Sequence, residues 1–356
     1  MLTAPHVFDD THLPARYPHR DAELEQCYRL LEPALHNRRA DNLLLSGPSG
    51  VGKTSLARYV TRTLQERTQL HTVHVRCIGS TTGQILRTIQ RGITEERVPE
   101  NQPVTTTTQQ LKTTIDQPAV IILDEADELP ETDVLQELQT LPQLSVIVII
   151  HDPTHWLSQI TTDMAHNLDG DNHIGLDRYT VDELADILED RANRGLPPNA
   201  VTRTQLERIA DEAAGVARRG IQALYAAAQI AAERNHTQIQ STDIDDCFPR
   251  ARRQIRKSNL RSLPFHHQVL YAILHQADEL TSRELHQRYE QLADEVYATA
   301  AVTPIGKRAR RDKLRKLQSY DLVEQHGENR WRRYTVRDQT VTPTVTLPET
   351  TDTIVS

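Results

Sequence analysis

The first half of the chain alternates short apolar runs with segments of helical spacing. Residues 41–46 contain a short apolar run, residues 118–123 and 144–150 are almost continuously apolar, and residues 71–77 alternate. A fully apolar run is typical of a parallel strand that is covered on both faces. Because helical spacing recurs at 20–35, 55–64 and 85–93, we predict an α/β fold with a mainly parallel sheet in three layers over residues 1–176. The Pro-, Thr- and Gln-rich stretch 100–108 predicts an exposed loop.

The middle of the chain predicts helices only. Thr180 and Glu183 have the spacing of a capping box, an apolar face follows, and Gly195 marks a stop. Further helical patterns cover 202–214 and 217–234, so residues 177–248 predict an all-helical lid. Residues 249–261 predict a basic helical connector with Pro249 near its start.

The pattern of residues 262–337 predicts a winged-helix domain. One helix is expected over 265–275, a second is capped at Thr281, and Thr303-Pro304 should begin a third. A hairpin with its turn at 327–329 then supplies the wing. The Thr- and Pro-rich tail 338–356 is expected to be disordered.

Charge separates the two halves of the chain. The net charge is −8, yet residues 250–337 carry 19 Lys and Arg against 10 Asp and Glu. A basic C-terminal module on an acidic body predicts a polyanionic partner. Cys27, Cys77 and Cys247 match no metal or redox spacing. No apolar run has membrane-spanning length and no signal pattern opens the chain, so we expect a cytoplasmic, nucleoid-associated protein without a membrane partner.

Residues 47–54 fit the P-loop pattern Gly-x-x-x-x-Gly-Lys-Thr between a predicted strand and a predicted helix. In that context, backbone N–H groups and the helix N-terminus cradle phosphates. Lys53 would reach the β- and γ-phosphates, and Thr54 would hold Mg²⁺. The sequence therefore predicts binding of a nucleoside triphosphate. The expected cofactor-binding residues of this segment are Pro48, Ser49, Gly50, Val51, Gly52, Lys53, Thr54 and Ser55.

Two later strands end in polar residues. Asp124 and Glu125 follow the run 118–123, at the sheet edge where α/β proteins bind ligands. Asp124 is the expected Mg²⁺ ligand, and Glu125 would orient or activate the attacking water. His151 follows the strand 144–150, where it would either contact the γ-phosphate or simply end the strand.

The predicted third helix and wing of the C-terminal module are dense in cations. Such a helix suits the major groove of DNA, with cations on the phosphates at its flanks. A protein-docking winged helix is the alternative. The predicted DNA-binding residues are Lys307, Arg308, Arg310, Arg311, Lys313, Arg315, Lys316, Arg330, Arg332 and Arg333.

Over residues 7–337 the chain resembles the archaeal origin-recognition and cell-division-control initiators, which are AAA+ ATPases with a C-terminal winged helix. Residues 17–20 resemble the family's entry motif near the adenine, which implies that Tyr17 and Arg20 bind nucleotide. Residues 215–224 resemble its sensor-2 segment, with Arg218 as the arginine that senses the γ-phosphate. The resemblance implies ATP or ADP with Mg²⁺ as cofactors. Duplex DNA with origin repeats, the replicative helicase and paralogous initiator subunits are the implied partners.

Three positions depart from the family pattern. His151 stands where the family has the sensor-1 asparagine, and Val216 stands where it usually has an acid. Residues 162–167 contain no arginine where the family shows an arginine-containing segment. These departures predict slow ATP hydrolysis, or a paralogue that uses ATP mainly as a conformational ligand.

The leading hypothesis is an ATP-dependent DNA replication initiator that binds origin duplex and promotes helicase loading, with ATP as a conformational switch. One alternative is a DNA-binding transcription or plasmid-maintenance regulator with weak or no hydrolysis. Another is a transposition-associated AAA+ helper that forms filaments on DNA.

Overall fold

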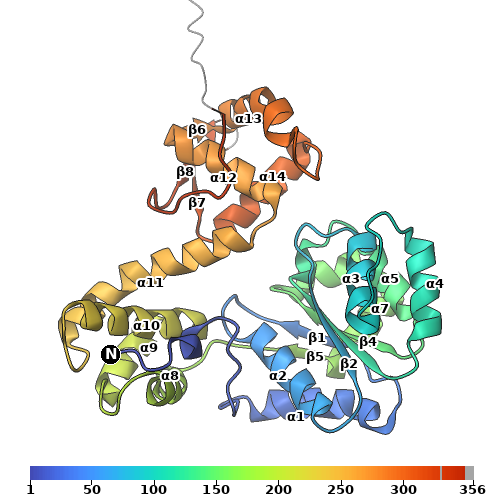
Figure 1. Cartoon of the computed structure of the whole chain (residues 1–356), viewed down its shortest axis with the longest axis horizontal. Helices are drawn as coiled ribbons and strands as arrows, with labels where there is room; N and C mark the ends of the chain where they lie inside the picture. Colours follow the sequence, from blue (N-terminus) through green and yellow to red (C-terminus); the bar gives the residue numbers. More distant parts are fainter. Residues whose placement is uncertain (329–330, 349–356) are drawn as a thin grey trace, which may run out of the picture. The chain divides into compact units, whose positions relative to one another are not determined.

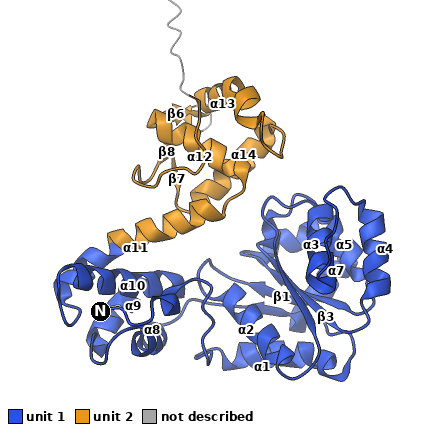
Figure 2. Cartoon of the chain, in the orientation of Figure 1, with its two compact units in different colours: residues 1–248 blue, residues 249–356 orange. Residues whose placement is uncertain are grey.

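The structure, a computed structural model, describes residues 1–328 and 331–348. It divides into two compact units, residues 1–248 and residues 249–356 (Figure 2). Among the described residues, no helix combines the length and the apolar run that a bilayer crossing needs.

A five-stranded sheet organises the first unit. Every pairing in it is parallel, as the alternating pattern predicted, and the strand order is β2-β3-β4-β1-β5. The strands are β1 (Leu43–Ser46), β2 (His71–Arg76), β3 (Ala119–Asp124), β4 (Leu144–Ile149) and β5 (His173–Gly175). Strand β5 was not predicted, because three residues are too few to show a period.

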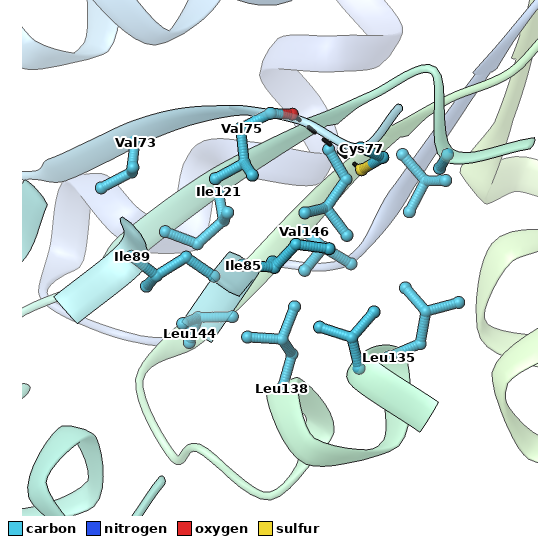
Figure 3. Close-up of a cluster of buried hydrophobic side chains, with 14 of the residues drawn as sticks. Val73, Val75, Cys77, Ile85, Ile89, Ile121, Leu135, Leu138, Leu144 and Val146 are labelled. Carbon is cyan, nitrogen blue, oxygen red and sulfur yellow. Dashed lines mark hydrogen bonds between the residues drawn. The ribbon is translucent and has the colours of Figure 1, made fainter. Parts of the chain in front are cut away.

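Helices cover both faces of this sheet (Figure 1). One face packs on α1 (Asp21–Leu31), the 3₁₀ segment η2 (Glu32–His36) and α2 (Lys53–Gln65). The other packs on α3 (Thr82–Thr94), α4 (Val104–Thr114), α5 (Asp133–Gln139) and α7 (Thr162–Leu168). Figure 3 shows Val73, Ile121 and Val146 of the strands meeting Ile85 and Leu138 of these helices. The apolar runs are therefore covered on both faces of the sheet. This packing holds in place the sheet edge at which the parallel strands end.

The prediction of an exposed loop over 100–108 was wrong from Val104 onwards. Helix α4 begins there after Pro103, and Thr107 and Thr108 are buried. Thr107 satisfies its hydroxyl by donating to the Pro103 carbonyl, and Leu111 packs in the core. Threonine clusters are typical of loops, but buried helices accept them when the hydroxyl bonds back to the preceding turn.

The lid contains α8 (Val181–Gly195), α9 (Arg203–Glu212) and α10 (Ala217–Glu233), and its last helix, α11 (Ser241–Ser262), continues into the second unit. Thr180 and Glu183 form the predicted capping box of α8. The predicted connector is not a separate helix, because α11 runs through Pro249 without interruption. Pro249 is an interior residue of this helix, a position where proline costs about 3 kcal/mol.

Within its described residues, the second unit contains three helices and a small antiparallel sheet after α11. They are α12 (Phe265–Ala277), β6 (Glu279–Thr281), α13 (Ser282–Tyr297), α14 (Lys307–Ser319), β7 (Val323–His326) and β8 (Arg333–Val336). The strands form an antiparallel sheet of order β6-β8-β7. Helix α14 begins at Lys307 with Gly306 as its N-cap, so the predicted start at Pro304 was wrong.

The described part of the tail differs from the prediction of disorder. Val341 and Leu347 are buried, and the Val341 carbonyl accepts a hydrogen bond from Tyr271 at 2.8 Å. Asp338 pairs with Arg253 and Arg256 of α11. Two apolar anchors and one carboxylate thus hold a segment whose composition is typical of disorder; residues 349–356 lie outside the described residues.

The remaining described elements are single turns. They are η1 (Pro5–Phe8), η3 (Ala126–Glu128), α6 (Pro153–Trp156), η4 (Leu157–Gln159) and η5 (Gly170–Asn172). Of these, η1 packs on the lid helices α8 and α10.

Candidate nucleotide site and basic surface

The glycine-rich segment forms the turn between β1 and α2, as predicted. Lys53 is the first residue of α2, and its side chain is only 7% exposed. Its ammonium donates to the Gly47 carbonyl at 2.6 Å and to the Pro48 carbonyl at 2.8 Å. The cation is therefore held inside the curve of the loop, at the N-terminus of a thirteen-residue helix. That position places positive charge and helix dipole together, which suits an anion.

Two glycines of the loop have backbone conformations and contacts that exclude a side chain. Gly52 has φ +101°, and a Cβ there would lie 2.4 Å from the Tyr17 hydroxyl. Gly50 has φ +81°, and its Cβ would lie 2.8 Å from Val216. Both residues that approach the loop belong to segments distant in sequence, so the loop is closed from the lid side as well as from the core.

The two predicted magnesium ligands lie together. The Thr54 hydroxyl donates to the Asp124 carboxylate at 3.0 and 3.1 Å. Burial acts to raise the pKa of Asp124, but hydrogen bonds with His74 and Thr54 outweigh it and lower the pKa. One hydroxyl and one ionised carboxylate are oxygen ligands of the kind Mg²⁺ accepts when phosphates complete its shell. Within the described ranges no cluster of three or more His, Cys, Asp and Glu forms an all-protein metal site.

Strand β2 supplies two basic residues that the sequence analysis missed. His74 Nε2 lies 3.0 Å from Asp124, and Arg76 donates to Glu125 at 3.3 Å. Only the parallel pairing of β2 with β3 places them there, with Arg76 in register with Asp124. The signal in the sequence was the alternation of polar residues along 71–76, which does not reveal the neighbouring strand.

Glu125, the predicted activator of water, adopts a left-handed backbone with φ 57° at the end of β3. Its carboxylate is directed toward Arg76. The carboxylate that would orient the attacking water is therefore already engaged by a guanidinium.

His151 follows β4 at the predicted edge of the site, and its ring contacts an acid that the sequence did not indicate. Its ring Nδ1 is 2.8 Å from Asp127, and its backbone N–H donates to the same carboxylate. The His151 carbonyl accepts the Gly47 N–H at 3.2 Å. His151 therefore connects β4 to the P-loop through its main chain, while its ring is held by Asp127.

Arg218 reaches the loop from the lid. It is the second residue of α10, and its backbone N–H donates to the Gly50 carbonyl at 3.1 Å. Its guanidinium forms a two-point ion pair with Asp10, with a shortest distance of 2.7 Å. Arg218 therefore lies at the P-loop, and its role as γ-phosphate sensor stays a prediction; the acidic partner was not foreseen.

Tyr17 and Arg20 pack beside the loop. The Tyr17 hydroxyl donates to the Gly52 carbonyl at 2.8 Å. Arg20 is buried over the Tyr179 ring at 4.2 Å and donates to Glu23 and to the Asp177 carbonyl. These contacts join the entry segment, the P-loop and the start of the lid.

The cations of α14 divide into outward and inward groups. Lys307, Arg308, Arg311 and Arg315 are exposed, and Lys313 is half-buried. Arg310 and Lys316 are each 3% exposed, so the prediction that they contact DNA is not compatible with their positions. Arg310 packs over Tyr289, donates to the His286 carbonyl and pairs with Glu290. Lys316 lies over Tyr320.

The wing presents an aromatic side chain among cations. Trp331 is 69% exposed, Arg332 is half-buried, and exposed Arg333 pairs with Glu279. Tyr334, by contrast, is buried. The predicted Arg330 lies outside the described residues. An exposed tryptophan beside Arg332 and Arg333 is a surface that suits a nucleic acid.

Family models match two parts of the chain. An AAA domain matches residues 35–160, and a Cdc6 AAA+ ATPase-type lid domain matches residues 185–248. With the parallel sheet, the P-loop and the lid contact at Gly50, they define an AAA+ ATPase core with a helical lid.

Curated relatives identify the family. ORC1-type DNA replication protein 9 of Halobacterium salinarum is 32% identical over 340 residues, which cover 94% of this chain and 93% of that protein. ORC1-type DNA replication protein 1 of the same organism is 30% identical, over 81% and 95%. The chain belongs to the ORC1-type DNA replication protein family, as the resemblance predicted, and its role is that of a DNA replication initiator.

Solved structures agree on the fold. The Aeropyrum pernix ORC1 protein in complex with DNA has a TM-score of 0.76 at 23% identity and covers 96% of this chain and 95% of its own. The Aeropyrum pernix ORC2 protein, described as ADPNP and ADP complexes, has a TM-score of 0.62 at 20% identity, with 94% of each chain covered.

Proposed function

We propose that the protein is an initiator in which bound ATP sets the conformation of the lid. The observation that carries this proposal is the convergence of Lys53, Thr54, Asp124 and Arg218 on one loop from the core and the lid. The Aeropyrum pernix ORC2 protein forms ADPNP and ADP complexes, and we extend nucleotide binding of that kind to this chain.

In this proposal the chain's residues divide the work of holding Mg·ATP. Lys53 would exchange its two carbonyl partners for the β- and γ-phosphates, and Thr54 and Asp124 would hold Mg²⁺. Arg218 would contact the γ-phosphate from the lid. Because Arg76 of β2 pairs with Glu125, we expect ATP hydrolysis to be slow. ATP would then act mainly as a conformational ligand.

Replacement of Lys53 tests the nucleotide site. Two charge-assisted hydrogen bonds are lost in Lys53→Ala, so ATP affinity should fall roughly a hundredfold or more in calorimetric titration. The exposed Lys112 of α4 offers a matched control, and Lys112→Ala should bind like the wild type. Retained tight binding by Lys53→Ala would remove the nucleotide site from the proposal.

The second unit is proposed to bind duplex DNA at origin repeats. Its exposed cations on α14 and the wing support this, and the Aeropyrum pernix ORC1 protein is known in complex with DNA. Loading of the replicative helicase, with help from paralogous initiators, is the proposed consequence. Genome-wide mapping of bound sites checks the role: the initiator requires sites at replication origins.

Two contacts favour a second candidate function. The His151 ring contacts Asp127, and Glu125 pairs with Arg76. A regulator that binds DNA with an almost inactive ATP site would use the same surfaces. Bound sites at promoters instead of origins, together with full function of a Glu125→Gln variant, would support the regulator.

A further inference from the structure

The segment before the nucleotide-binding core is fastened to the lid. Phe8 is almost fully buried and stacks on Tyr225, with ring centroids 5.3 Å apart. Gln222 donates to the Phe8 carbonyl at 2.9 Å, and Arg191 donates to the Val7 carbonyl at 2.6 Å. None of these contacts involves Asp10, so they fix the segment irrespective of what Asp10 binds.

This fastening delivers the Asp10 carboxylate to Arg218. Arg218 Nε lies 3.1 Å from both carboxylate oxygens, and Nη2 lies 2.7 Å from one of them. The pair uses one edge of the guanidinium, in the two-point geometry by which arginine binds carboxylates and phosphates alike. The same arginine is anchored through its backbone N–H to Gly50 of the phosphate-binding loop.

We infer that Asp10 is a built-in competitor of the γ-phosphate for Arg218 and thereby sets how strongly the protein prefers ATP to ADP. The inference rests on the proposed nucleotide site and on Arg218 acting there. With no triphosphate bound, the carboxylate neutralises the arginine. When ATP binds, the γ-phosphate takes the guanidinium and Asp10 returns to water.

Both side chains of the Asp10–Arg218 pair are partly exposed to water, so the γ-phosphate can replace the carboxylate on Arg218. The Asp10 side chain is 41% exposed and the Arg218 side chain 28%. An ion pair that remains in contact with water contributes little, typically at most about 1 kcal/mol. A phosphate of higher charge can therefore displace the carboxylate, but only after overcoming a penalty that ADP, without a γ-phosphate, does not meet.

Titration of the full-length Asp10→Asn variant tests the inference. With Mg²⁺ present, we expect affinity for a non-hydrolysable ATP analogue to rise roughly fivefold, while affinity for ADP stays unchanged. The adjacent exposed Asp9 provides the matched control, and Asp9→Asn should resemble the wild type for both nucleotides. In an Arg218→Ala background, Asp10→Asn should have no further effect, because competition requires the arginine.

Other outcomes would overturn the inference. Weaker binding of the ATP analogue by Asp10→Asn would make Asp10 a positioning residue for Arg218. Equal shifts for ATP analogue and ADP would make its effect non-specific. Lys53→Ala reports separately: if nucleotide binding survives that change, the phosphate site itself is wrong. If Lys53→Ala abolishes binding but Asp10→Asn changes nothing, only the competitor role of Asp10 is lost.

Discussion

The P-loop and the basic helix α14 are both dense in functional residue types, yet the sequence specified them to different degrees. Every residue of the loop is placed by its neighbours, because a strand, a glycine turn and a helix leave one path for its eight residues. On α14 the cations surround the helix, and the position of each one depends on what packs against it. Arg310 and Arg311 are adjacent in sequence, but one is buried and the other exposed. The density of cations in the sequence indicates a basic surface, whereas burial in the fold decides which of those cations belong to it.

The strongest test of this comparison uses those two arginines. Arg310→Ala removes the contact with Tyr289 and the hydrogen bond to the His286 carbonyl, and leaves a cavity. We expect the free energy of unfolding to fall by about 2 to 3 kcal/mol in denaturant titrations. Arg311→Ala should change it by less than about 0.5 kcal/mol. Similar losses from both would show that α14 does not divide its cations as described.

Two buried histidines of the second unit should make its stability depend on pH. Burial, followed by the charges of nearby lysines, lowers the pKa of His267 to about 3. Burial, followed by the charge of Arg310, lowers the pKa of His286 to about 4. Below pH 6.5 the unfolded chain takes up protons that the folded unit does not, so stability falls as the pH falls toward these values. The loss is about 1.4 kcal/mol per pH unit for each histidine.

Stability measured by denaturant between pH 7 and pH 5 checks this expectation. The double variant His267→Gln and His286→Gln should lose most of the slope over that range. An unchanged slope would show that other groups carry it.

Salt dependence separates the exposed cations from the buried ones in DNA binding. Each phosphate contact contributes about one to the slope of log affinity against log salt. Arg308→Ala and Arg311→Ala should each lower the slope by about one, in titrations of labelled duplex. Lys112→Ala on α4 is the charge-matched control, and a slope that stays constant in the α14 variants would favour the protein-docking alternative.

The smallest expected effect belongs to the wing. Trp331→Ala should weaken duplex binding about fivefold through lost aromatic contact, without altering the salt slope. The chain has only two tryptophans, and Trp156 is buried, so DNA should quench the fluorescence of a Trp156→Phe variant that retains Trp331. Fluorescence that DNA leaves unchanged would place Trp331 off the interface.

Much of the site could be read from local patterns. The P-loop, the acids after β3, the lid helices and the capping box of α8 were predicted because each depends on residues within a few positions of one another. His74 and Arg76 were missed because strand neighbours in a parallel sheet are set by crossovers, which the alternation of β2 does not encode. Asp10 was missed because 208 positions separate it from Arg218, and no local pattern indicates that the two residues meet.

The sequence by itself determined the phosphate-binding loop, the alternation of strands and helices in the first half of the chain, and the excess of cations near the C-terminus, because these follow from short-range geometry and composition. The tertiary structure alone decided which basic side chains contact Asp124 and Glu125, which acid pairs with Arg218, and which arginines of α14 are exposed to solvent. The physical reason is that burial and pairing depend on distant segments that pack together, and packing is a property of the whole fold.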